Sequence, residues 1–336
     1  MGRVTFSLRL FHPKYWLVWL GFGCWYVFVQ ILPFRVLMWC GAMLGRVAAM
    51  LSERRSIVAR KNIALCFPEL SEAEQNDLFW RSMESVGRGV VDSGIAWFWP
   101  KWRLKRVLDI EGFPLLMDAL ADGQGVLLYN YHFTSMEIGL AAINSSYPEQ
   151  NYGVYRPHAN AVYEYLMRKG RERHGPETVA VPRKDVRKMV KALRTGNILF
   201  YLPDQDYGRR YSVFVPFMGV DAATVTAGSQ LAKMGRAKVL SYCATRKPDG
   251  SGYRVKIYPP IDGYGQNEND DACNVNQFLE ARIRECPEQY LWVHRRFKSR
   301  PDGQHDFYEL DGLKSFQRRK KRRDKLREKK RKQAES

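Results

Sequence analysis

The sequence predicts an α/β fold in which a mixed sheet is flanked by helices and preceded by an N-terminal membrane-anchoring helix. Short apolar runs typical of buried strands alternate with helical patterns from about residue 125 onward, which favours an α/β domain with ligand chemistry at the strand ends. A long apolar segment precedes that region, at residues 15–34. The length of 336 residues suffices for one large domain with appendages.

The segment at residues 15–34 contains twenty residues without a formal charge. As a helix it would span about 30 Å, the thickness of the hydrocarbon core of a bilayer. Residues 36–51 continue apolar with one arginine, which is typical of an amphipathic interfacial helix. We therefore expect residues 1–52 to form a membrane anchor followed by an interfacial helix. The alternative is a hydrophobic helix that lies on the membrane surface or packs in the core.

The body of the chain, residues 53–316, is expected to form one catalytic domain. A Ser71-x-x-Glu74 capping box predicts a helix that runs from there to about Ser93. A Pro-Asp-Gly-Ser turn at 248–251 predicts a hairpin. In chain order, we expect strands at 125–131, 152–156, 198–202, 238–245 and 252–258, and helices at 134–144, 160–171, 184–194, 223–234 and 274–285.

The charge balance indicates anionic partners, because 54 Lys and Arg face 35 Asp and Glu, a formal net charge of +19. Residues 318–332 alone carry twelve basic and two acidic side chains. We expect residues 317–336 to be a basic tail, disordered or a solvated helix. It either adheres to anionic membranes or is an extension with no role of its own. A nucleic-acid binder would interleave aromatic residues for base stacking, and residues 317–333 contain none. No nucleic-acid partner is therefore expected.

The six cysteines are scattered, and none forms a CxxC pair or a zinc-like cluster. They are typical of reduced, buried thiols rather than of a disulfide framework. The sequence therefore predicts no metal site.

His132 and Glu137 are the candidate catalytic pair. His132 directly follows the strand predicted at 125–131, and Glu137 lies one helical turn into the next element. An imidazole can take a proton from an alcohol while a carboxylate fixes its tautomer and stabilises the imidazolium. By itself this spacing more often marks a structural, hydrogen-bonded histidine than a catalytic one.

Five further residues are candidates for substrate binding. Arg156 ends a predicted strand, where a phosphate could sit, since Arg binds phosphate bidentately. Asp204 and Asp206 lie in a loop after another strand and could orient Arg156 or a sugar hydroxyl. Arg295 and Arg296 could bind a glycolipid phosphate or an acidic protein. Surface ion pairs and solvated turns account for the same residues equally well.

Several distinctive stretches are spread over most of the chain, at 11–17, 61–69, 96–100, 132–137, 153–157, 203–208, 213–217 and 288–298. Through these stretches the chain resembles the late (secondary) acyltransferases of lipid A biosynthesis. The resemblance is nearest to the lauroyl and palmitoleoyl branch. Residues Thr134–Met136, which are more polar than expected, depart from the family pattern, and so does the basic tail.

The resemblance implies transfer of a fatty acyl group from acyl carrier protein to a hydroxyl of Kdo2-lipid IVA, with His132 and Glu137 as the catalytic dyad. It also implies a single N-terminal anchor in the bacterial inner membrane, a catalytic domain on the cytoplasmic side, inner-membrane lipids as partners and no cofactor. Two alternatives stay open. One is a myristoyl-specific lipid A enzyme, and the other is a glycerophospholipid acyltransferase, whose dyad generally has Asp in place of Glu137.

Overall fold

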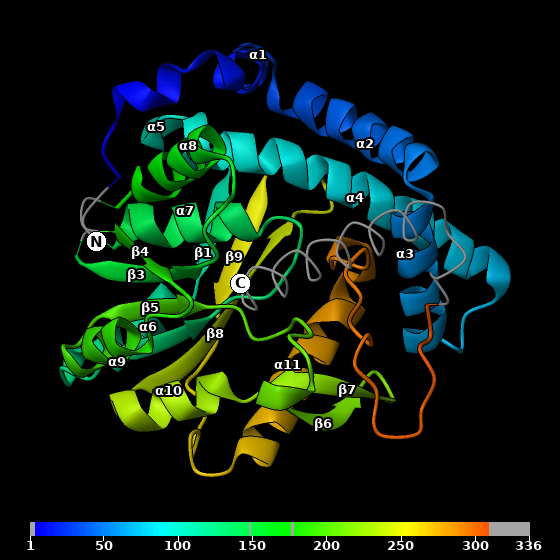
Figure 1. Cartoon of the computed structure of the whole chain (residues 1–336), viewed down its shortest axis with the longest axis vertical. Coiled ribbons are helices and arrows are strands. Elements are labelled where there is room, and N and C mark those ends of the chain that lie inside the picture. Colours follow the sequence, from blue (N-terminus) through cyan, green and yellow to red (C-terminus); the bar gives the residue numbers. More distant parts are fainter. Residues whose placement is uncertain (1–3, 148, 176–177, 309–336) are drawn as a thin grey trace, which may run out of the picture.

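The computed structural model describes residues 4–147, 149–175 and 178–308. The basic tail predicted at 317–336 lies outside these residues. The expected domain boundary after residue 52 falls between two helices, and the division into domains stays a prediction. Figure 1 shows a sheet covered by helices on both faces, with the first helices lying along one side of the molecule.

The predicted span at 15–34 is interrupted in the structure. The helix α1 (Trp16–Ile31) is followed at once by α2 (Phe34–Leu51). The break occurs because Pro33 lacks an N–H and forces Leu32 out of the helical conformation; Leu32 has φ −77° and ψ 143°. Within the described residues, α2 is the one helix long and apolar enough to cross a membrane. The segment expected to be interfacial is thus the candidate span.

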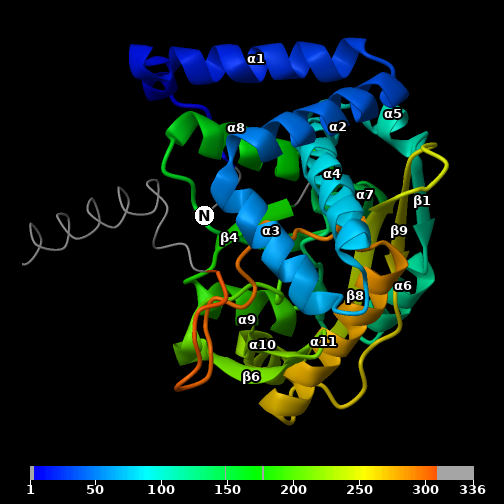
Figure 2. The same cartoon turned by 90° about the vertical axis from the view of Figure 1, so that its right-hand side faces the viewer.

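Helix α2 packs against α4 (Glu72–Phe98) through backbone contact (Figure 2). A Cβ added at Gly45 would overlap the carbonyl oxygen of Met83, and one at Gly87 would overlap the backbone of Gly41 and Gly45. Three glycines therefore allow the two helices to approach more closely than side chains would permit. Helix α2 cannot leave the domain without breaking this contact.

The outer sides of α1 and α2 expose large apolar side chains. On α1, Leu17 is 83% exposed and Ile31 73%, and on α2, Trp39 is 64% and Met50 71% exposed. A contiguous apolar surface of this kind marks a membrane or protein interface. The N-terminal helices are thus consistent with a membrane-associated protein.

The expected α/β fold with a mixed sheet is confirmed. Seven strands lie in the order β1-β9-β8-β2-β5-β3-β4, and each neighbouring pair is parallel except the antiparallel hairpin β8–β9. The strands are β1 (Leu108–Glu111), β2 (Val126–Tyr129), β3 (Asn151–Tyr155), β4 (Thr178–Pro182), β5 (Ile198–Tyr201), β8 (Lys238–Arg246) and β9 (Tyr253–Ile257).

A separate two-stranded hairpin, β6 (Ser212–Phe217) and β7 (Val220–Val225), was not predicted. Its turn consists of Met218 and Gly219, both with positive φ, at 51° and 77°, as a two-residue hairpin turn requires. The helix expected from residue 223 consequently begins only at Ala227.

Alternate side chains of β2 face different helices. Val126 and Leu128 pack in a cluster with α6 (Phe113–Ala121) and α7 (Met136–Ser146). Leu127 and Tyr129 join the larger cluster on the other face. That face is covered by α9 (Val186–Arg194), α10 (Ala227–Gly235) and α11 (Glu268–Glu285).

The remaining helices connect these layers. Helix α4 begins with the predicted capping box, in which the Ser71 N–H donates to the Glu74 carboxylate at 2.8 Å. It continues past the predicted end to Phe98. The other helical segments are η1 (Leu8–Phe11), η2 (Pro13–Tyr15), α3 (Glu53–Cys66), α5 (Lys101–Lys105), α8 (Ala161–Glu172), η3 (Arg209–Tyr211) and η4 (Pro287–Gln289).

Candidate active site

His132 and Asp204 meet at the carboxyl edge of the sheet. The parallel strands β2 and β5 end with Tyr129 opposite Tyr201, and each of the two polar residues lies three positions beyond that pair. His132 Nδ1 lies 2.6 Å from Asp204 Oδ1, and the His132 backbone N–H donates to Asp204 Oδ2 at 2.9 Å. The Tyr290 hydroxyl also donates to this carboxylate, at 3.2 Å. Asp204 therefore fixes both the ring and the backbone of His132.

The environment keeps Asp204 ionised. Its side chain has no exposed surface. Burial raises the pKa of Asp204, but the nearby His132 and the hydrogen bonds that it donates lower this pKa below its ordinary value. An ionised carboxylate accepts hydrogen bonds and cannot donate them. The proton of a neutral His132 ring thus lies on Nδ1, which leaves the lone pair on Nε2 to act as a base.

Glu137 is buried at the start of α7 and has different partners from those expected. Trp97 Nε1 donates to Oε2 at 2.9 Å, and Arg171 Nε lies 3.1 Å from each carboxylate oxygen. A further hydrogen bond comes from Arg171 Nη2. Burial raises the pKa of Glu137, but the Arg171 charge and these hydrogen bonds lower it overall. Glu137 is thus a carboxylate held by a guanidinium.

The carboxylate paired with His132 is therefore Asp204 and not Glu137, which corrects the expected geometry. The cause is topological: two parallel strands in register bring their next residues together, whereas the turn at Thr134 and Ser135 directs Glu137 toward α4 and α8. Among the described residues no hydrogen bond joins His132 to Glu137. The catalytic roles of both residues stay predictions.

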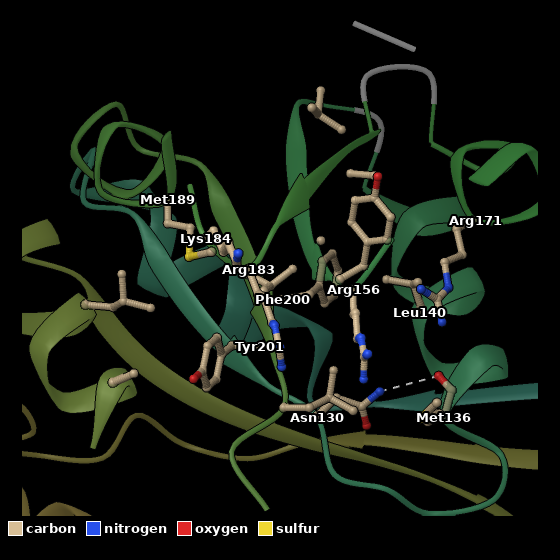
Figure 3. A pocket seen from close by; sticks show the side chains of 18 of the residues that line it. Asn130, Met136, Leu140, Arg156, Arg171, Arg183, Lys184, Met189, Phe200 and Tyr201 are labelled. Atoms are coloured by element: carbon tan, nitrogen blue, oxygen red, sulfur yellow. Dashed lines mark hydrogen bonds between the residues drawn. The ribbon is translucent and has the colours of Figure 1, made fainter. Parts of the chain in front are cut away.

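One cavity of about 780 Å³ contains both His132 and Glu137 in its lining. Figure 3 shows Arg156, Arg171 and Arg183 reaching into it from different segments. The volume lies in the range of ligand pockets, which are mostly apolar with a few placed polar groups. Apolar lining residues include Leu140, Val154, Met167, Phe200 and Leu231, and the cationic ones are Arg156, Arg168, Arg171, Arg183 and Lys184.

The other sequence candidates divide between the cavity and the protein interior. Arg156 is exposed and lines the cavity. Asp206 is buried and accepts hydrogen bonds from the Ser299 N–H at 2.6 Å and the Ser299 hydroxyl at 2.9 Å. These bonds hold the loop after β5. A contact between Asp206 and substrate stays a prediction.

Arg295 and Arg296 also have partners within the protein. Arg296 is 2% exposed and donates to the carbonyl oxygen of Ala223 at 2.7 Å and to the Thr224 hydroxyl at 2.9 Å. Arg295 pairs with Asp306 at 2.6 Å. Neither residue lines the cavity of His132, so the substrate-binding role expected of them has no support from their positions.

Arg171 and Trp97 are the site residues that the sequence analysis missed. Arg171 lies on α8 and Trp97 near the end of α4, both far from Glu137 in the sequence. A buried carboxylate requires a cation or hydrogen-bond donors, so the burial of Glu137 demands such partners. The sequence carries no spacing signal that identifies them.

A buried carboxylate that orients a histidine at the carboxyl edge of a sheet, above a largely apolar cavity, is typical of α/β enzymes with a histidine base. A sequence model of the bacterial lipid A biosynthesis acyltransferases matches residues 3–299. The chain therefore belongs to the bacterial lipid A biosynthesis acyltransferase family, and the acyltransferase class expected from its motifs is confirmed.

Individual relatives agree with the branch inferred from the motifs. The chain is 39% identical to the lipid A biosynthesis palmitoleoyltransferase of Escherichia coli strain K12, over 91% of this chain and 99% of the relative. It is 40% identical to the lauroyltransferase of that strain, over 89% and 96% of the two chains. Identity to the myristoyltransferase of the same strain is 27%, over 90% and 93%.

Proposed function

We propose that this lipid A acyltransferase transfers a fatty acyl group from acyl carrier protein to a hydroxyl of Kdo2-lipid IVA, with His132 as the general base. The observation that carries the proposal is the Asp204–His132 pair at the wall of a cavity with a largely apolar lining. The Asp204 carboxylate leaves Nε2 of His132 as the nitrogen that accepts the proton, and the apolar lining suits an acyl chain.

The reaction follows from this arrangement. His132 Nε2 removes the proton of the acceptor hydroxyl as its oxygen attacks the thioester carbonyl carbon. A new C–O bond forms and the carbonyl oxygen becomes an oxyanion. The oxyanion then collapses, the C–S bond breaks, and the thiolate leaves with the proton held by His132. Asp204 stabilises the imidazolium throughout and keeps its own negative charge.

In the proposed mechanism Glu137 acts indirectly, through Arg171. Its carboxylate holds a guanidinium in the lining of the cavity. A cation fixed in a site of low dielectric stabilises negative charge as it develops. We therefore assign Arg171 to the oxyanion or to a phosphate of the acceptor, and Glu137 to the positioning of Arg171.

The exposed apolar sides of α1 and α2 support a place at the membrane where a lipid acceptor resides. The proposal puts the enzyme at the bacterial inner membrane with its catalytic domain on the cytoplasmic side, where acyl carrier protein is made available.

The test uses purified full-length protein in detergent, with radiolabelled Kdo2-lipid IVA and acyl carrier protein loaded with lauroyl, myristoyl or palmitoleoyl chains. We expect one added acyl chain in the product mass and a preference for one donor. His132→Ala should lower turnover by at least about 10²-fold with an unchanged melting temperature. Acylation of glycerol phosphate in place of the glycolipid, or normal turnover in folded His132→Ala, would contradict the proposal.

A further inference from the structure

Helix α9 presents a basic face, formed by Arg187, Lys191 and Arg194 together with Lys184 just before the helix. All four side chains are exposed. Residues 187, 191 and 194 follow helical spacing and therefore share one side. Among the described residues, no ion pair is recorded for any of the four. This face thus carries uncompensated positive charge.

The fold uses Arg194, whose Nε donates to the carbonyl oxygen of Met234 at 2.8 Å, but within the described part of the chain the side chains of Lys184, Arg187 and Lys191 have no such structural contact. The opposite side of α9 is buried through Met189, Ala192 and Leu193, and that side secures the helix. Like charges four residues apart, as in Arg187 and Lys191, destabilise a helix by about 0.2–0.5 kcal/mol. An acidic residue at position 187, in the first turn, would remove this repulsion and suit the helix dipole. The exposed basic face is therefore available to an anionic partner.

The basic face adjoins the catalytic cavity through Lys184, which belongs to both. Arg183, Lys184 and Val186 line that cavity and are exposed, and Met189 reaches it from the buried side of α9. A molecule bound on this face therefore lies beside the cavity that would receive a donor acyl chain.

The position of α9 distinguishes a protein partner from a lipid surface. In both views α9 is distant from α1 and α2, which carry the exposed apolar side chains (Figures 1 and 2). A bilayer in contact with α1 and α2 would leave α9 facing the aqueous phase. A water-soluble anionic partner suits this location.

We propose that the basic face of α9 is the docking surface for an acidic surface of the protein that delivers the acyl thioester. The inference rests on the proposed function, because it takes a carrier protein as donor. Complementary charge steers encounter and holds register. A docked carrier brings its thioester to the cavity entrance between α9 and His132.

The experiment compares two double charge reversals in the full-length protein. Arg187→Glu/Lys191→Glu alters the basic face. Lys169→Glu/Arg173→Glu makes the same change at the same spacing, at exposed positions in the last turn and at the C-cap of α8, which lies next to α1. For the α9 variant we expect KM for acyl carrier protein to rise by about tenfold or more at low salt while kcat stays within about twofold. The effect should shrink as salt screens the charges.

Binding of fluorescently labelled acyl carrier protein, followed by anisotropy, should weaken by the same factor in the α9 variant and stay near wild type in the α8 variant. Flotation with phosphatidylglycerol vesicles should be unaffected by the α9 changes. An unchanged KM, an equal loss in the α8 variant, or a loss of vesicle binding in the α9 variant would overturn the docking surface. Wild-type protein that accepts no acyl group from the carrier would instead refute the proposed donor.

Discussion

His132 and Asp204 occupy equivalent positions after neighbouring strands, and this equivalence makes the carboxylate the orienting partner of the imidazole. Closeness in sequence predicts Glu137 as the partner of His132, but the structure places Asp204 there. The position of a residue relative to a strand end is visible in the sequence. Which strands are neighbours is set by tertiary packing, so the Asp204 contact could not be predicted.

Asp204→Asn tests the orienting contact. The amide preserves the size of the side chain but can donate to Nδ1, which would move the ring proton to Nε2 and abolish the base. We expect kcat to fall by about 10²- to 10⁴-fold, measured with acyl carrier protein as donor. Thermal melting serves as the control for folding, and a folded variant with more than half of wild-type kcat would contradict the role.

The Glu137–Arg171 pair predicts a coupled loss. Glu137→Gln leaves the Arg171 guanidinium without its counter-charge, which should cost about 3–5 kcal/mol of unfolding free energy. Glu137→Gln/Arg171→Gln should recover most of that stability because neither charge remains. Activity should stay low in both variants, as both disturb the cation in the cavity. Recovery of activity together with stability in the double variant would show that the pair is structural.

His294 predicts a pH dependence of stability. Burial and the nearby His132 lower the pKa of His294 to about 4, and its Nε2 accepts a hydrogen bond from the Asp206 N–H at 3.3 Å. The unfolded chain, with a His pKa of about 6.5, binds the proton more readily. The contribution of this residue is thus complete above pH about 6.5 and is lost as the pH falls toward 4.

Urea unfolding at pH 7.5 and pH 5 measures the effect. The free energy of unfolding of wild type should fall between these values by on the order of 2 kcal/mol more than that of His294→Gln, because glutamine does not titrate. If the free energy of unfolding fell equally in both proteins, His294 would be excluded as the source of the decrease, and titrating carboxylates would account for it.

At the scale of elements, local sequence signals predict the positions of individual helix starts and turns, whereas contacts between elements that are distant in sequence cannot be predicted from them. The capping box at Ser71 located the start of α4, and the turn at 248–251 located the β8–β9 hairpin. The Met218–Gly219 turn escaped prediction because methionine rarely adopts positive φ. The close contact of α2 with α4 is encoded by glycines whose partner helix the sequence does not identify.

Gly45→Ala tests that contact. A Cβ at this position meets the backbone of Met83, so α2 must move away from α4, and we expect a loss of about 1–3 kcal/mol by overpacking. Gly21→Ala on α1 is the matched control, because nothing lies within 4 Å of its Cβ; helix propensity should leave it neutral or more stable by up to about 1 kcal/mol. Thermal melting in detergent compares the two variants, and equal melting temperatures would contradict the close packing of α2 against α4.

For the molecule as a whole, the apolar surface of α1 and α2 lies on a different part of the body from the basic face of α9, which borders the cavity. In the proposed arrangement, membrane contact through α1 and α2 leaves α9 facing the water from which the proposed carrier approaches, while the cavity extends from α9 to His132. A soluble donor and a lipid acceptor can thus reach the same imidazole from two phases.

This arrangement predicts which side chains hold the protein on a membrane. Leu17→Ser/Leu20→Ser on α1 replaces side chains that are 83% and 63% exposed. Each buried leucine contributes about 1.5–3 kcal/mol, so partition into vesicles should fall by about 10²-fold or more. Met117→Ser on α6, 41% exposed, removes a comparable side chain away from α1 and should change little. Flotation at high salt, where attraction by the basic residues is screened, isolates the apolar contribution. Equal retention of both variants on vesicles would mean that the bilayer contacts another side of the protein. The inference that α9 faces the aqueous phase would then be contradicted as well.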